Sequence, residues 1–545
     1  MNFDFQLTAL QDAELIHAAK DHGDEFLFKH ALTQETAYRS LLKTQRRDLH
    51  RAVAQAIEKT FPDQKGKLSD VLAYHWELAE VPERARRYLY RAAQDATRRY
   101  ANQEALALFE RALAASAGAK PEEMMALHEA RGRIYEFLSQ YAQAIADYQA
   151  ALPLARQAKL AVDECRIMSR IAWMYSLGGE GEQAVALATQ VEVRARELGD
   201  QSAALRAYLV QGLVAQARGD LQVAYPRLRA ALAASRASDE PVMEGESWFY
   251  LGIQNNFMGR FGRAAACARR AYELKKGLSD RVGEIVSLYL WARAETGQGN
   301  YDIALDTLEQ GHAVAKVIRN PFGLAQYPNT RAWLAAELGD WETAYDIDHA
   351  GLTLAVNSPI RPPEISTRLN LMLDCIALGK LQEADAHILE LMKWFGRTEF
   401  GFHAWRWQIR FTDAQARLLL AHRLYDDAAL IVSELMDWAE RTQSAKYKMR
   451  ALLMRAQIYL ANDQIRLARD SATMACHLAD AMAHMPGRIQ SQIMLAQISD
   501  RMEPGSAQQY RAQAAQLLKT LDASLKHPAL RRSFERGLGN IQHVA

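Results

Sequence analysis

Residues 337–347 read ELGDWETAYDI, and the same pattern returns along the chain every 40 residues. TGQGNYDIALD (296–306) comes before it, and ALGKLQEADAH (377–387) follows it. Most copies place a glycine first, a large apolar residue two positions later and an alanine three positions after that. The glycines of the regular copies are Gly179, Gly219, Gly259, Gly299, Gly339 and Gly379. A pattern at a fixed interval indicates an array of one repeated structural unit.

Each repeat predicts two helices joined by a tight turn. In the copy at 283–317, Tyr301, Ala304 and Leu305 recur at the spacing of one helical face. The repeated glycine suits the left-handed backbone that ends a helix. The small residues let the two helices approach closely, so we expect a larger side chain at Ala304 to destabilise the fold. The turn position Asp302 should tolerate change better.

The pattern resembles the tetratricopeptide repeat, whose usual period is about 34 residues. The longer period adds nearly one turn to each helix. The sequence therefore predicts an all-α fold, a right-handed α-solenoid of about eleven tetratricopeptide-like helix hairpins. We expect a winged-helix remnant and helical cap at 1–80, the hairpins at 81–525 and a tail at 526–545.

The composition excludes several classes of protein. The chain has 66 Lys and Arg against 65 Asp and Glu, and this net charge of +1 gives no reason to expect a nucleic-acid partner. No apolar run approaches the ~20 residues that cross a bilayer, so no membrane partner is expected. The four cysteines form no CxxC pair, which is typical of a reducing compartment. We expect a soluble, cytoplasmic protein.

The N-terminal region does not follow the repeat. FLFKHALTQETAYRSLLKTQRRDLHRAVAQAIE (26–58) is similar to the segment that follows the ATPase core in bacterial STAND-type ATPases, especially those joined to adenylate/guanylate cyclase domains. The resemblance continues through LAYHWELAE (72–80) and YANQEALALFERAL (100–113). It returns in HPALRRSFERGLG (527–539), which resembles the short tail of such proteins.

This resemblance implies the C-terminal sensor portion of a signalling ATPase. LTALQDAELIH (7–17) looks like the last helix of the winged-helix domain, and FLFKHAL (26–32) like its closing strand. No GxxxxGK[ST] phosphate loop and no cyclase core are evident. We therefore expect no enzyme, no catalytic residue and no cofactor. The alternative is a fragment of an ATP-binding cyclase whose catalytic domains lie upstream of residue 1.

The 15 histidines form no HExxH motif and no Cys/His set at metal-ligand spacing, so no metal site is expected. His30 and His50 fall in the family motif, where we expect them to be structural. His312, His349 and His387 lie on second helices and are expected at the surface.

The first helices of tetratricopeptide arrays line a concave groove. The repeat phase directs six side chains into it: Arg206, Asn256, Arg293, Asn329, Trp333 and Arg410. Arg and Asn bind peptide carboxylates and backbone groups. We expect these residues to bind a protein or peptide partner, with the chain's own ATPase and cyclase domains as one candidate. A small-molecule signal is an alternative ligand, and a merely solvated wall is the competing interpretation.

The arginine-rich stretch RARRYLYRAAQDATRR (84–99) has two interpretations. Neighbouring acidic residues offset much of its charge, which favours a solvated face. The other interpretation is a docking surface for an ATPase domain.

Overall fold

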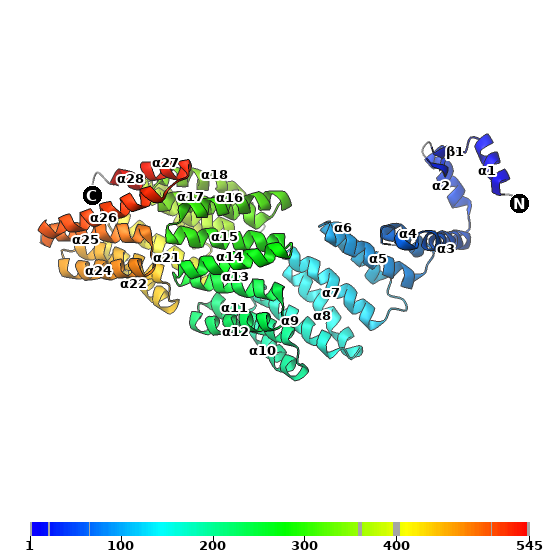
Figure 1. Cartoon of the computed structure of the whole chain (residues 1–545), viewed down its shortest axis with the longest axis horizontal. Helices are drawn as coiled ribbons and strands as arrows, with labels where there is room; N and C mark the ends of the chain where they lie inside the picture. The colour runs from blue at the N-terminus through cyan, green and yellow to red at the C-terminus, as the bar shows by residue number, and fades with distance from the viewer. Residues whose placement is uncertain are drawn as a thin grey trace. The chain divides into compact units, whose positions relative to one another are not determined.

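The computed structural model of the protein describes residues 3–19, 22–64, 66–357, 362–395, 404–502 and 504–541. The chain forms two compact units, residues 1–167 and 168–545, and both consist mainly of helices (Figure 1). The boundary falls inside α9 (Ala161–Gly178), within the repeats. The division expected at residue 80 rests on the repeat pattern and stays a prediction, whereas the contacts divide the repeat array itself.

Unit 1 begins with a short helix and a two-stranded antiparallel sheet. Its elements are α1 (Phe3–Asp12), β1 (Ile16–Ala19), β2 (His22–Phe28), α2 (Ala31–Ser40), α3 (Lys43–Thr60), η1 (Pro62–Gln64), α4 (Ser69–Leu78), α5 (Pro82–Arg98), α6 (Asn102–Ala114), α7 (Pro121–Phe137) and α8 (Tyr141–Gln157).

The helix expected at 7–17 begins earlier, at Phe3, and already ends at Asp12, where Glu14 just beyond it adopts a left-handed backbone with φ of 53°. Ile16 then pairs with Phe28 across the strands. The closing strand expected at 26–32 is therefore found only as far as Phe28, because α2 already begins at Ala31.

Buried polar side chains join the helices of unit 1. His50 on α3 is 9% exposed, and its two ring nitrogens lie 2.9 Å from Tyr38 Oη and 2.9 Å from His75 Nδ1. Burial lowers the pKa of His50, which favours the neutral ring. His50 therefore links α2, α3 and α4, which supports its expected structural role.

The arginine-rich stretch at 84–99 is not a uniform solvated face. Arg86 is 3% exposed and donates to the Ala115 carbonyl at 2.7 Å and to the Glu123 carboxylate. Arg84 pairs with Glu58 at 2.7 Å. These two arginines hold neighbouring helices together.

Unit 2 continues the repeat from α9. Its elements are α10 (Gly181–Leu198), α11 (Gln201–Arg218), α12 (Leu221–Ala237), α13 (Pro241–Phe257), α14 (Phe261–Gly277), α15 (Arg281–Gln298), α16 (Tyr301–Ile318), α17 (Pro321–Glu337), α18 (Trp341–Val356), α19 (Pro362–Ala377), α20 (Leu381–Met392), α21 (Ala404–Ala421), α22 (Tyr425–Arg441), α23 (Ala445–Ala461), α24 (Ile465–Ala481), α25 (Met485–Met502), α26 (Pro504–Ser524), α27 (Pro528–Arg536) and α28 (Leu538–Ile541).

The predicted α-solenoid is confirmed. Within the described residues, α5 to α26 form eleven consecutive helix pairs. Local chemistry sets where the helices start: the side chains of Asp200, Asp280 and Asn320 accept hydrogen bonds from backbone N–H groups of the first turn. The repeated alanines pack as expected, since Ala304 is completely buried. No helix in the described part of the chain is long and apolar enough to cross a membrane.

The repeat array of unit 2 closes on itself, and several of the recurring glycines lie at the closure. Gly219 and Gly259 have φ of +85° and +71° and end α11 and α13. Gly219 lies against Trp405 at the start of α21, and Gly259 against Ala445 at the start of α23. The contacting helices are five pairs apart, so later repeats pack on earlier ones. The glycine therefore serves both the turn and a close approach.

Hydrogen bonds between distant segments fix this closure. Trp405 Nε1 donates to the Gln216 carbonyl at 2.8 Å, and Ser444 Oγ donates to the Phe257 carbonyl at 3.1 Å. In Figure 1, the orange and yellow helices of the later repeats lie beside the green helices of the earlier ones.

The C-terminal segment extends the closure. The Asp302 carboxylate accepts from the backbone N–H groups of Lys526 at 3.1 Å and His527 at 2.7 Å. The Leu538 N–H donates to the Leu338 carbonyl at 2.9 Å. Asp302 is therefore more than a turn position, because its carboxylate anchors a segment that is distant in the sequence.

Candidate functional site

The inner face of unit 2 contains a cavity of about 90 Å³. Its lining comes mainly from the first helices of successive pairs, α13, α15, α17, α19, α21 and α23. Since a 3.6-residue period keeps one stripe of each helix turned inward, these helices present their polar stripes to a common space. Closure of the array places α21 and α23 across from the earlier helices.

Five of the six expected groove residues line this cavity: Asn256, Arg293, Asn329, Trp333 and Arg410. Arg206 lies on α11 and is not among the lining residues. The repeat phase thus brings together residues from α13, α15, α17 and α21.

Asn329 differs from the expectation of a solvated groove residue. It is 4% exposed, and its Nδ2 donates to Asp348 Oδ1 at 2.8 Å. Its Oδ1 accepts from Ser366 Oγ at 2.7 Å, and its backbone carbonyl accepts from Asn370 Nδ2 at 3.3 Å. The asparagine therefore joins α17, α18 and α19, and replacing it would disturb packing as well as the cavity wall.

Arg410 is held in place by neutral acceptors. Its Nη1 donates to Ser366 Oγ at 3.2 Å, and its Nη2 donates to Asn370 Oδ1 at 2.9 Å. Within the described residues, no carboxylate lies within ion-pair distance of this guanidinium. These bonds orient the group while its positive charge stays uncompensated.

Arg293 and Arg406 are held mainly by aromatic rings. Arg293 lies over the Trp333 ring at 5.1 Å and donates to Tyr289 Oη at 3.3 Å. Arg406 lies over the Trp407 ring at 4.4 Å, and within the described ranges its buried Nε has no hydrogen-bond partner. Neither guanidinium pairs with a carboxylate in the described part of the chain. Cation–π contacts hold a guanidinium without neutralising it.

These charges act on each other and on Tyr289. Burial lowers the pKa of Arg406 to about 10, and Arg293 and Arg410 add to this effect. Burial alone would raise the pKa of Tyr289, but the three arginines outweigh it and lower that pKa. The cavity is therefore a region of positive potential.

Two further cations line the cavity and are paired. Lys446 Nζ lies 3.1 Å from Glu337 Oε1, and Arg450 Nη1 lies 2.9 Å from Asp413 Oδ2. Burial would raise the pKa of Glu337, but the neighbouring cations lower it to about 2. Burial lowers the pKa of Lys446 to about 8, although Glu337 favours its charged form. These ion pairs join α17, α21 and α23.

The sequence analysis missed Arg406, Lys446, Tyr447 and Arg450, which also line the cavity. The repeat pattern slips by four residues after the copy at 377–387, so the phase of the later first helices was less clear. A signal was present, since Arg406 and Arg410 lie one helical turn apart on α21, as do Lys446 and Arg450 on α23.

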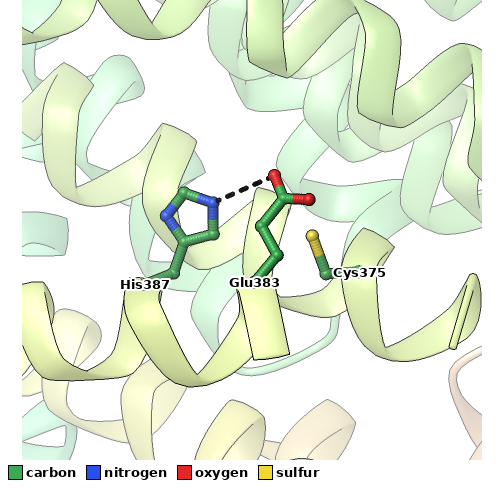
Figure 2. A group of neighbouring side chains, drawn as sticks. All are labelled: Cys375, Glu383 and His387. Carbon is green, nitrogen blue, oxygen red and sulfur yellow. Dashed lines mark ion pairs between the residues drawn. The ribbon is translucent and has the colours of Figure 1, made fainter. Parts of the chain in front are cut away.

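A second group of polar side chains lies between α19 and α20. The ligand atoms of Cys375, Glu383 and His387 are within 4.8 Å of one another (Figure 2). Zn²⁺ binds thiolate, carboxylate and imidazole groups of this kind. However, Tyr345 Oη already donates to Glu383 Oε1 at 2.9 Å, and burial together with Glu383 raises the pKa of Cys375 to about 12. The arrangement is thus a hydrogen-bonded contact that favours the neutral thiol.

His387 is 8% exposed, which corrects its expected surface position. Burial lowers its pKa and so favours the neutral ring.

Comparisons with known proteins show which solved structures have a similar fold. No protein-family model matches the sequence, and no curated protein matches it. The structure is similar to that of a Rap protein complexed with competence and sporulation factor, with 14% identity, coverage of 67% of this chain and 100% of that chain, and a TM-score of 0.51.

Two weaker similarities were found. A STAND protein with a tetratricopeptide repeat sensor from Pyrococcus horikoshii shows 15% identity, coverage of 72% of this chain and 59% of that chain, and a TM-score of 0.46. This chain thus spans less than two thirds of that protein's length. The apo form of RapI shows 11% identity, coverage of 64% and 95%, and a TM-score of 0.40.

By its fold, this protein is a tetratricopeptide-like α-solenoid. Unit 2 adds a closed array of repeats with an inner basic cavity.

Proposed function

We propose that this protein is a non-catalytic interaction module and that the inner cavity of unit 2 binds a protein or peptide partner. The observation that carries the proposal is the convergence of Arg293, Arg406 and Arg410 on one cavity, where none of the three has a carboxylate partner among the described residues. A buried cation without a counter-ion is costly for stability. Binding of an acidic group would offset that cost, and this gives the arrangement a use beyond folding.

The chemistry of the lining supports recognition of a polar partner. Guanidinium groups donate to carboxylates and similar anions in a planar fork, and the rings that hold them reduce the entropy lost on binding. The Rap protein with a similar fold was crystallised with competence and sporulation factor. That complex supports the idea that a repeat array of similar fold can bind a partner.

We place this module in the regulatory part of a cytoplasmic signalling ATPase, in the manner of cyclase-associated STAND proteins. The support is the motif at 26–58 and the tail motif at 527–539. The genomic sequence upstream of Met1 tests this placement. An in-frame phosphate loop there would support it, whereas an unrelated upstream gene would count against it.

The binding proposal is tested by capture of partners from the native host. The variant Arg293→Ala/Arg410→Ala should capture the partner at least about tenfold less than the wild type, because each hydrogen bond to a charged group contributes about 1.5–3 kcal/mol. The matched control is Arg466→Ala/Arg469→Ala, at exposed positions on the outer helix α24.

Quantitative mass spectrometry would measure the captured proteins, and melting curves would show that both variants fold. Equal capture by the wild type and the cavity variant, with normal melting, would refute the cavity as the binding site.

A further inference from the structure

We infer that the cavity binds a phosphate group, either as the free anion or as a phosphomonoester on a larger ligand. This inference rests on the proposed function, since it names the chemical group that the cavity recognises. It is carried by the number of uncompensated cations, by their geometry and by an unsatisfied buried donor.

The charge of the lining favours a dianion. Five cations face the cavity: Arg293, Arg406, Arg410, Lys446 and Arg450. Two carboxylates pair with part of this set, those of Glu337 and Asp413. Five positive and two negative charges leave a net charge of +3 around the cavity. A carboxylate would neutralise one of these charges, whereas a phosphate monoester carries about −1.5 to −2 at pH 7.

Two buried acids near the cavity wall do not change this balance. Burial raises the pKa of Asp348 to about 8, although Asn329 donates a hydrogen bond to it. Burial and the neighbouring Asp348 raise the pKa of Asp374 to about 9. Both carboxyls are therefore mainly protonated and neutral at pH 7.

The geometry suits an anion with several acceptor oxygens. Arg406 and Arg410 project from one face of α21, and Arg293 on α15 is close enough to both to influence their pKa values. Guanidinium forks bind phosphate through paired N–H···O bonds. The cavity of about 90 Å³ is several times the space that one water needs, so a small polyatomic anion fits within it.

Arg406 supplies the most direct indication. Its buried Nε has no hydrogen-bond partner among the residues that the structure describes, and buried polar groups are otherwise nearly always paired. A phosphate oxygen in the cavity would satisfy this donor and would at the same time neutralise the guanidinium.

The test is a thermal-shift titration of the full chain at constant ionic strength. Inorganic phosphate and O-phospho-L-serine are the two phosphate probes, and acetate represents carboxylates. Phosphate should raise the melting temperature in a saturable way, while acetate should not. A shift with inorganic phosphate alone indicates the free anion as ligand, and tighter binding of O-phospho-L-serine indicates a phosphorylated partner.

Arg406→Met should weaken phosphate binding at least tenfold. Its ligand-free melting temperature should equal or exceed that of the wild type, because the variant loses an unpaired buried charge. Arg466→Met is the control and should keep the full shift. If Arg406→Met does not fold, Arg293→Met serves the same purpose, since Arg293 also has no carboxylate partner in the described part of the chain.

Three results would overturn the inference: no phosphate shift in the wild type, an equal shift with acetate, or an undiminished shift in folded Arg406→Met or Arg293→Met. Loss of partner capture by Arg293→Ala/Arg410→Ala without any phosphate effect would leave the proposed function standing and reject phosphate. A phosphate effect with unchanged capture would support phosphate binding and reject the cavity as the site that binds the protein partner.

Discussion

Replacing Asp374 by asparagine should make the protein more stable at neutral pH. Asp374 lies on α19 and is 2% exposed, and none of the described residues forms a hydrogen bond with its Oδ2. Burial, together with the nearby Asp348, raises its pKa to about 9. In the unfolded chain the pKa is about 3.9. At any pH between these two pKa values, Asp374 holds a proton in the folded protein and has released it in the unfolded chain.

The sign and size of the effect follow from this difference. The free energy of unfolding of the wild type falls as the pH rises from about 4 to about 9, because the unfolded state binds fewer protons in that range. About three pH units separate pH 7 from the pKa of Asp374 in the unfolded chain, and each unit lowers the free energy of unfolding by about 1.4 kcal/mol. The contribution lost at pH 7 is therefore up to about 4 kcal/mol. Asparagine is neutral at every pH and avoids this loss.

Urea unfolding followed by circular dichroism at pH 4, 7 and 8.5 measures the effect. The advantage of Asp374→Asn should be near zero at pH 4 and should grow with pH. Asp470→Asn, at an exposed position on α24, is the matched control and should show no such trend. Parallel pH profiles for wild type and Asp374→Asn would show that Asp374 is ionised in the folded protein, and the reasoning would fail.

Three other substitutions test the fold. Gly259→Ala should destabilise more than Gly379→Ala in denaturant unfolding, because both glycines have positive φ but a Cβ would meet close neighbours only at Gly259; equal losses would count against the closure contact. Asp302→Ala should speed amide hydrogen exchange across 526–538, whereas unchanged exchange would show that its carboxylate does not anchor the segment. Ala304→Leu should cost about 1–3 kcal/mol by overpacking a completely buried contact, and a neutral result would show that the repeat phase is wrong.

The sequence predicted the repeat because its signals are local. A glycine, an aromatic residue and an alanine at fixed spacing define a turn and the close contact of two adjacent helices. Ala304 is accordingly buried, and Gly259 adopts the left-handed backbone. The same phase directed Arg293 and Arg410 toward one cavity, because each successive first helix repeats the orientation of the last.

The closure of unit 2 could not be predicted in this way. It depends on contacts such as that of Phe257 with Ser444, between residues far apart in the sequence, which reflect small rotations summed over five helix pairs. The burial of Asn329 also depends on neighbours from two other helices. A periodic pattern shows which face a residue occupies and leaves open what packs against that face.

The central claim, that the inner cavity binds the partner, is tested most directly by site-specific photo-cross-linking. A benzoylphenylalanine would replace Tyr447 in the cavity lining, or Leu430, which is 72% exposed on the outer helix α22. Irradiation in the native host should yield a partner cross-linked through position 447 and none through position 430. A partner that cross-links only through position 430 would place the binding surface on the outer face and contradict the account.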